Sequence, residues 1–128
     1  PPFWEDLKSR LYLCCTMENQ RCVDERLPLF LYTPLVHREI IVEPMLGAVD
    51  FHGKLGGIER ITVGGESGLN ARPCHYEWVL DVRRQCREAE IGFHFKQTGG
   101  NFHKDGKHYR LPHRVQLSQA ARAGIDLP

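Results

Sequence analysis

The stretch of sequence from residue 60 to residue 97 reads RITVGGESGLNARPCHYEWVLDVRRQCREAEIGFHFKQ. It opens with an apolar run at residues 60–63 and closes with a second run at residues 91–95. Between them, apolar side chains recur at steps of three and four positions from Trp78 to Cys86, which is the spacing of a helix that buries one side. Two strands joined by a crossover helix predict a parallel pair. This stretch therefore predicts an α/β fold.

Two further apolar runs precede this stretch, at residues 11–16 and 39–42. Apart from the first, the runs are continuous at their centres rather than alternating, which suits parallel strands that are covered on both faces. Four mainly parallel strands with crossover helices amount to about half of an eight-stranded (β/α) barrel. A small open sheet is the alternative that the same pattern allows.

Helices are expected before and between these strands. In the first, over residues 2–10, Trp4 and Leu7 should face inward. Asn19 is placed to cap the second, which should run to about Leu29 and end irregularly because Pro28 lacks an amide hydrogen. The third should span residues 75–90.

The chain divides by charge into two parts. Residues 1–95 carry 11 basic and 14 acidic side chains, whereas residues 96–128 carry 6 basic and 2 acidic ones and three of the seven histidines. We therefore predict an α/β half-barrel over residues 1–98 and a basic tail over residues 99–128 that packs on the same domain. The tail should be mostly irregular, with a hairpin that turns at Asp105-Gly106 and a short helix at residues 117–123.

Composition narrows the class of protein. A chain of 128 residues with 41% hydrophobic and 26% charged residues is typical of one globular domain. It has no run of 18 apolar residues, which excludes a membrane span, and it shows no signal-peptide pattern, so a cytoplasmic location is the default expectation. Its five cysteines include no C-x-x-C pair, which argues against a disulfide framework and against a self-contained metal site.

Polar side chains follow each of the four predicted strands. Because the carboxyl ends of parallel strands share one edge, these side chains should meet there and form a ligand site. Three carboxylates together need a cation, which a nearby basic side chain, a metal or a cationic substrate group could provide. The alternative is that Glu18, Asn19 and Glu66 only cap helices and loops. The predicted substrate-binding residues are Glu18, Asn19, Glu43, Glu66, Arg72, Lys96 and Gln97.

The remaining motifs favour structural roles. The glycine-rich turn after residue 63 could present amides to an anion or could be a plain turn. His94 fits a structural histidine, Cys14 and Cys86 fit core positions, and the spacing of His103, His108 and His113 is not that of a helical metal site. The tail could contact a phosphate backbone or be a solvated hairpin, and its candidate residues are Lys104, Lys107, Arg110 and Arg114.

Six motifs in this order resemble one family. They are residues 18–20 (ENQ), 42–47 (VEPMLG), 63–68 (VGGESG), 71–73 (ARP), 84–86 (RQC) after Trp78, and 95–97 (FKQ). The family is the phage-associated group often described by phage gene products 37 and 68, whose members are similar to radical-SAM proteins with a three-cysteine motif. The resemblance runs from about residue 11 to the end of the chain.

The resemblance implies the C-terminal, substrate-side half of a (β/α) barrel in an otherwise uncharacterised phage or prophage protein. It implies an iron–sulfur cluster and S-adenosylmethionine only for a full-length member, because the three-cysteine cluster lies in an N-terminal half that this chain lacks. Either that half or a second copy of the chain should cover the exposed barrel edge, so a homodimer is one expectation. By the same resemblance, Glu18, Glu43, Glu66, Arg72, Lys96 and Gln97 would line the pocket.

Two alternatives remain from other classes of function. The chain could be a small binding or inhibitor protein, or an accessory that contacts nucleic acid through the basic tail. It could also be a metal hydrolase that uses Glu18, Glu43, Glu66 and a histidine, although no paired ligand motif supports this. No metal is expected, and no reaction or catalytic residue follows from the sequence.

Overall fold

Four parallel strands form the main sheet, in the order in which they occur along the chain. The computed structural model describes residues 2–128, with the side chains of residues 3–128. The sheet order is β1-β2-β3-β5, and every neighbouring pair is parallel, as the sequence predicts. All four predicted strands are confirmed, as β1 (Tyr12–Thr16), β2 (His37–Val42), β3 (Arg60–Gly64) and β5 (Gly92–Gln97).

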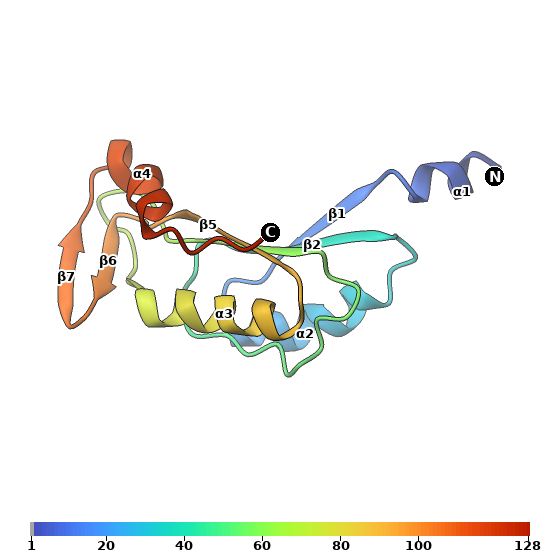
Figure 1. Ribbon diagram of the computed structural model, residues 1–128, viewed down its shortest axis with the longest axis horizontal. Helices are drawn as coiled ribbons and strands as arrows, with labels where there is room; N and C mark the ends of the chain where they lie inside the picture. Colours follow the sequence, from blue (N-terminus) through green and yellow to red (C-terminus); the bar gives the residue numbers. More distant parts are fainter. Residues whose placement is uncertain (1) are drawn as a thin grey trace.

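Two crossover helices lie on the same side of this sheet (Figure 1). Helix α2 (Gln20–Leu31) connects β1 to β2, and α3 (Tyr76–Glu88) connects β3 to β5. Strands in ascending order with both helices on one face are the arrangement of a (β/α) barrel segment, and no closed barrel forms within residues 2–128. The mixed α/β prediction is therefore confirmed.

The connection from β2 to β3 contains no helix, and buried side chains of a long loop fill its place. The loop is joined to α3 by Gln85, whose side chain accepts a hydrogen bond from the Phe51 amide at 2.9 Å and donates one to the Val49 carbonyl at 2.8 Å. The core side chains from this loop are Met45, Val49, Phe51, Leu55 and Ile58.

Helix α2 begins as predicted but does not end as predicted. The Asn19 side chain accepts a hydrogen bond from the Cys22 amide at 3.0 Å, which confirms the N-cap. The irregular end at Pro28 is wrong, since the helix continues to Leu31. Pro28 removes a hydrogen bond only on the solvent side, while buried Leu27 and Phe30 hold the last turn against the core.

Helix α1 (Pro2–Lys8) forms, but its apolar side chains do not face inward. Trp4 is 36% exposed and Leu7 is 39% exposed, so their predicted burial is wrong. The reason is the position of α1, which lies beyond the amino-terminal end of β1 and away from the sheet (Figure 1), so no core lies beneath it.

The tail is more regular than the sequence indicates. The predicted hairpin is confirmed as β6 (Asn101–Lys104) and β7 (Lys107–Arg110), and both turn residues have positive φ (Asp105 52°, Gly106 72°). A short strand that the sequence did not reveal, β4 (Cys74–His75), pairs in parallel with β6. Helix α4 (His113–Ala123) starts four residues before the predicted position. No helix in residues 2–128 has the length and apolar character needed to cross a membrane.

The two edges of the main sheet differ. Along β5, Leu127 exchanges backbone hydrogen bonds with Phe93 and the Asp126 carboxylate accepts the Phe95 amide, so the C-terminal segment covers this edge. Strand β1 pairs only with β2 within the described residues, and its Tyr12 and Cys14 side chains are exposed. The predicted core position of Cys14 is therefore wrong.

Candidate functional site

Side chains from two strands meet at the carboxyl edge of the sheet. Glu43 follows β2, and its carboxylate accepts a hydrogen bond from Lys96 Nζ at 3.0 Å and another from Gln97 Nε2 at 2.6 Å, both from β5. The intervening strand β3 ends in Gly64, and a Cβ there would lie 2.9 Å from Glu43 Cδ. Glycine at this position therefore leaves the space in which the side chains meet.

This contact group extends to the tail. Ser67 Oγ lies 3.0 Å from Gln97 Oε1 and 2.8 Å from Gln116 Oε1, and the Gln116 amide donates to the Leu111 carbonyl at 2.9 Å. Gln116 is 1% exposed. The sequence analysis missed it, because a polar residue on a tail helix gives no signal that it will be buried beside a strand end.

Each of the other two predicted carboxylates has its own arginine. Glu66 binds Arg72 through both carboxylate oxygens, at 2.9 and 2.7 Å, and also accepts the Arg72 amide. These hydrogen bonds lower the pKa of Glu66 to about 2. Glu18 contacts Arg26 at 3.0 Å, and its pKa is lowered first by its own backbone amide.

Of the seven predicted substrate-binding residues, the structure thus joins Glu43, Lys96 and Gln97 in one contact group. Each of the three carboxylates has a basic side chain beside it, since Lys96 pairs with Glu43, Arg72 with Glu66 and Arg26 with Glu18. Asn19 caps α2, as the structural alternative proposed.

The glycine-rich turn after β3 is held by a close backbone crossing. A Cβ on Gly65 would lie 2.3 Å from the Thr98 carbonyl oxygen, and one on Gly99 would lie 2.8 Å from the Gly65 Cα atom. The Gly65 amide donates to the Gln97 carbonyl, and the Gly100 amide donates to the Glu66 carbonyl. The Gly65 amide is therefore engaged within the chain, and the close crossing gives the two glycines a structural role.

The four basic candidates of the tail are spread over different surfaces. Lys107 and Arg110 are exposed on β7, Lys104 lies over the Tyr76 ring at 4.9 Å, and Arg114 lies on α4. None of them has an ion pair with a carboxylate anywhere in residues 2–128.

Histidines stack across the small sheet. The His75 and His103 rings are 4.6 Å apart, the His103 and His108 rings are 4.4 Å apart, and Trp78 lies 4.3 Å from His75. Burial lowers the pKa of His103, and the neighbouring His108 and His75 lower it further. The sequence did not reveal this stack, because it depends on the pairing of β4 with β6. His113 is not part of it, and His94 pairs with Asp126 at 2.7 Å, as expected for a structural histidine.

The cysteines do not fit an iron–sulfur cluster. Cys74 and Cys86 are buried, and burial raises the pKa of each thiol to about 12. Cys14 is exposed on β1. No group of three histidine, cysteine or acidic side chains in the described residues could hold a metal ion. The burial of Cys86 confirms its predicted core position.

A family model matches nearly the whole chain. It is described as "Protein of unknown function (DUF5131)" and matches residues 3–124. The chain belongs to this family. The match includes every residue of the contact group at the carboxyl edge as well as the tail helix that packs beside it. No curated protein and no solved structure matches the chain.

Proposed function

We propose that this chain is the substrate-side half of a phage-type, radical-SAM-like enzyme whose ligand site is the carboxyl edge of the sheet. One observation carries the proposal: Glu43 from the end of β2 meets Lys96 and Gln97 from β5 across the glycine end of β3. Parallel α/β folds bind ligands at this edge. The residue motifs that resemble the radical-SAM-like phage family include all three of these positions.

The charges of this contact group suit a zwitterionic ligand. The Lys96 side chain is 48% exposed and that of Glu43 is 17% exposed, so their ion pair lies at the rim. A zwitterionic ligand can replace this pair without leaving either side chain unpaired, because it brings an opposite charge to each. An α-amino-acid group, which S-adenosylmethionine also carries, would place its ammonium on Glu43 and its carboxylate on Lys96.

The cluster chemistry would come from outside this chain. By the resemblance, a full-length member would carry an iron–sulfur cluster for reductive chemistry, and the cysteines described above do not fit such a cluster. This chain would bind and orient the substrate and part of S-adenosylmethionine.

The open edge of the sheet supports a partner at β1. Exposed apolar side chains accumulate there and on α1, with Tyr12 60% and Phe3 66% exposed, and an unpaired edge strand is a template for another strand. An N-terminal half of the kind that the resemblance implies would cover this surface, and a second copy of the chain would do so in its place. Light scattering tests this expectation, since a monodisperse monomer of the 128-residue chain would contradict it.

The first experiment concerns the natural gene product. We expect a protein on the order of 250 residues, with bound iron and absorbance at about 400 nm. Intact mass and iron content measure both properties. A gene product of 128 residues without iron would refute the proposed radical chemistry.

The second experiment tests the carboxyl edge itself. Exchanging the charges in Glu43→Lys/Lys96→Glu keeps an ion pair but reverses its polarity. We expect this variant to lose the binding of S-adenosylhomocysteine, a stable analogue, in an NMR titration. The matched control exchanges Glu39 and Arg60, an ion pair at the amino end of β2 and β3 with a distance of 3.1 Å. Equal binding by both variants would mean that the carboxyl edge is not the site.

A second candidate function rests on the unpaired basic side chains of the tail. Lys107 and Arg110 are exposed on β7 with no carboxylate partner in residues 2–128, as a phosphate-binding surface requires. Under this candidate, Lys107→Ala with Arg110→Ala should weaken the salt-dependent binding of a single-stranded oligonucleotide, whereas the Glu43/Lys96 exchange should not.

A further inference from the structure

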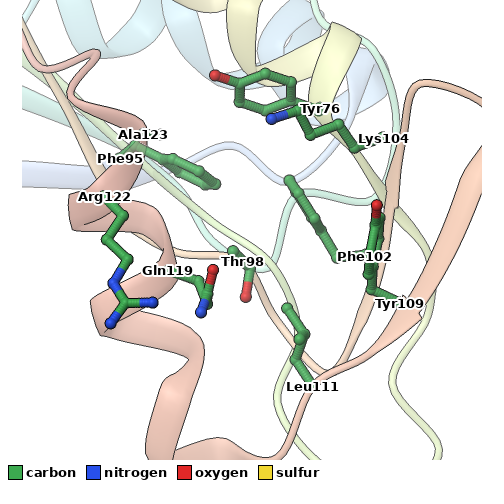
Figure 2. Close-up of a pocket in the computed structure, with 10 residues that line it drawn as sticks. All are labelled: Tyr76, Phe95, Thr98, Phe102, Lys104, Tyr109, Leu111, Gln119, Arg122 and Ala123. Atoms are coloured by element: carbon green, nitrogen blue, oxygen red, sulfur yellow. The ribbon is translucent and has the colours of Figure 1, made fainter.

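A pocket opens beside the carboxyl-edge contact group, on the side of the tail. It has a volume of about 280 Å³ and opens between the β6–β7 hairpin, the start of α3, β5 and α4. Figure 2 shows the side chains that line it. Glu43, Lys96 and Gln97 are not among them, so the pocket is a separate site.

The walls of this pocket are rich in aromatic rings. Phe95 and Phe102 have ring centroids 6.1 Å apart, and Tyr76 lies 6.3 Å from the first and 5.9 Å from the second. Phe95 is 2% exposed and Phe102 is 6% exposed, so the two rings form the floor of the pocket, over which a flat ring of a ligand can lie. The volume is at the lower end for ligand pockets, which limits the ligand to about one or two rings.

The charge of the pocket has one sign. Lys104 and Arg122 line it, and no acidic side chain does. Neither cation has a carboxylate partner in residues 2–128. In Figure 2 they lie on opposite sides of the pocket, with the Phe95 ring between them. Two unpaired cations beside an apolar surface attract an anion that also has an apolar body.

Arg122 is better placed than Lys104 to hold the acid group. The Lys104 ammonium already lies over the Tyr76 ring at 4.9 Å, in a cation–π contact. Arg122 has no ion pair or hydrogen bond of its own among the side-chain contacts of the described residues, and its planar guanidinium binds carboxylate and phosphate through two hydrogen bonds. Gln119, one turn earlier on α4, lines the same wall and adds an amide.

We propose that this pocket binds a small aromatic anion, an aryl carboxylate or aryl phosphate. The ring of the ligand lies over the floor that Phe95 and Phe102 form, and Arg122 holds its acid group. The site is independent of the proposed radical-SAM-like function, because the side chains assigned to that function, Glu43, Lys96 and Gln97, do not line it.

The test is an NMR titration of the 128-residue chain with phenyl phosphate, benzoate and the neutral benzyl alcohol. We expect both anions to shift the amide signals of the pocket residues and to bind about tenfold more tightly than benzyl alcohol, which is the effect of one charge-assisted contact. Binding of phenyl phosphate but not benzoate would identify the ligand as a phosphate ester, and the reverse would identify it as a carboxylate. Equal binding of all three probes, or no shift with any of them, would overturn the proposal.

Two variants assign the contact. Arg122→Gln should weaken the binding of the anions about tenfold and leave that of benzyl alcohol unchanged. Arg114→Gln is the matched control, since Arg114 lies on the same helix but does not line the pocket. Equal anion affinity in the two variants would refute the role of Arg122. The Glu43→Lys/Lys96→Glu exchange should leave the pocket unaffected, so that failure here is distinguishable from failure of the carboxyl-edge proposal.

Discussion

Replacement of Gly65 by alanine should destabilise the fold strongly, because of the backbone crossing beneath the glycine-rich turn. The added Cβ would lie 2.3 Å from the Thr98 carbonyl oxygen and 2.9 Å from the Gly99 Cα atom. Both contacts are with backbone, so no side chain can rotate away to relieve them. Since an ordinary contact is about 3.5 Å or more, the two segments must separate by about 1 Å.

The magnitude follows from two contributions. Overpacking of this kind costs about 1–3 kcal/mol. The separation also strains the two hydrogen bonds across the crossing, Gly65 to Gln97 and Gly100 to Glu66, at about 1 kcal/mol each. We therefore expect the free energy of unfolding to fall by about 3–5 kcal/mol. A chain of 128 residues has on the order of 6–19 kcal/mol, so the variant should still fold.

Urea unfolding followed by circular dichroism measures this change. With a slope of about 2 kcal/mol per molar urea, the midpoint should fall by roughly 1.5–2.5 M. Gly47→Ala is the matched control, because no atom lies within 4 Å of its added Cβ and its φ is not positive. In both variants alanine lowers the conformational entropy of the unfolded chain, which stabilises the fold by about 0.4–1 kcal/mol, but only Gly65→Ala adds the clash. Equal midpoints for the two variants would refute the steric argument.

Three further predictions concern single side chains. Arg72→Gln should raise the pKa of Glu66 from about 2 toward its usual value of 4.5 in a carboxyl NMR titration. In the wild type, this pair stabilises the fold above about pH 4.5, and its contribution is lost as the pH falls toward 2. If the variant lost stability over the same acid pH range and by the same amount as the wild type, the prediction would be contradicted. The pKa of His103 lies below 6.5 in the folded chain, so below that pH the unfolded chain binds the proton more readily. The urea midpoint should therefore decrease as the pH is lowered from about 7.5 to about 5.5, and it should decrease less in His103→Gln. An equal decrease in both proteins would argue against the histidine stack as the cause. A thiol reagent should modify exposed Cys14 in the native protein. It should modify Cys86 only after unfolding, because that thiol is buried and its pKa is raised to about 12. Mass spectrometry of a digest made after labelling the native protein shows which of the two cysteines carries the label.

The main sheet was predictable because its signals are local. Continuous apolar runs mark β2, β3 and β5, and the helical spacing from Trp78 to Cys86 marks α3. The Asn19 cap and the Asp105-Gly106 turn are also local, since each depends on a few neighbouring residues. Position along the strands then placed Glu43, Lys96 and Gln97 at one edge, because the carboxyl ends of parallel strands coincide.

The remaining features depend on residues that are distant in the sequence. Strand β4 has only two residues and exists because β6 pairs with it. The histidine stack follows from that pairing, and buried Gln116 reaches Ser67 across 49 positions of sequence. No periodicity in a short window contains this information. The inward prediction for Trp4 failed for a related reason, since helical spacing indicates an apolar side without saying whether anything packs against it.

The tail and the half-barrel depend on each other. Gly99 belongs to the tail but crosses the backbone of Gly65, and Gln116 contacts the Ser67 side chain beside the carboxyl-edge contact group. At the other end of the tail, Leu127 pairs with Phe93 and covers the edge of β5. Removal of residues 99–128 would therefore expose an edge strand, loosen the glycine crossing and leave polar side chains at the carboxyl edge without partners. For this reason the charge boundary near residue 96 marks a change in surface composition, whereas the packing continues across it from β5 into α4.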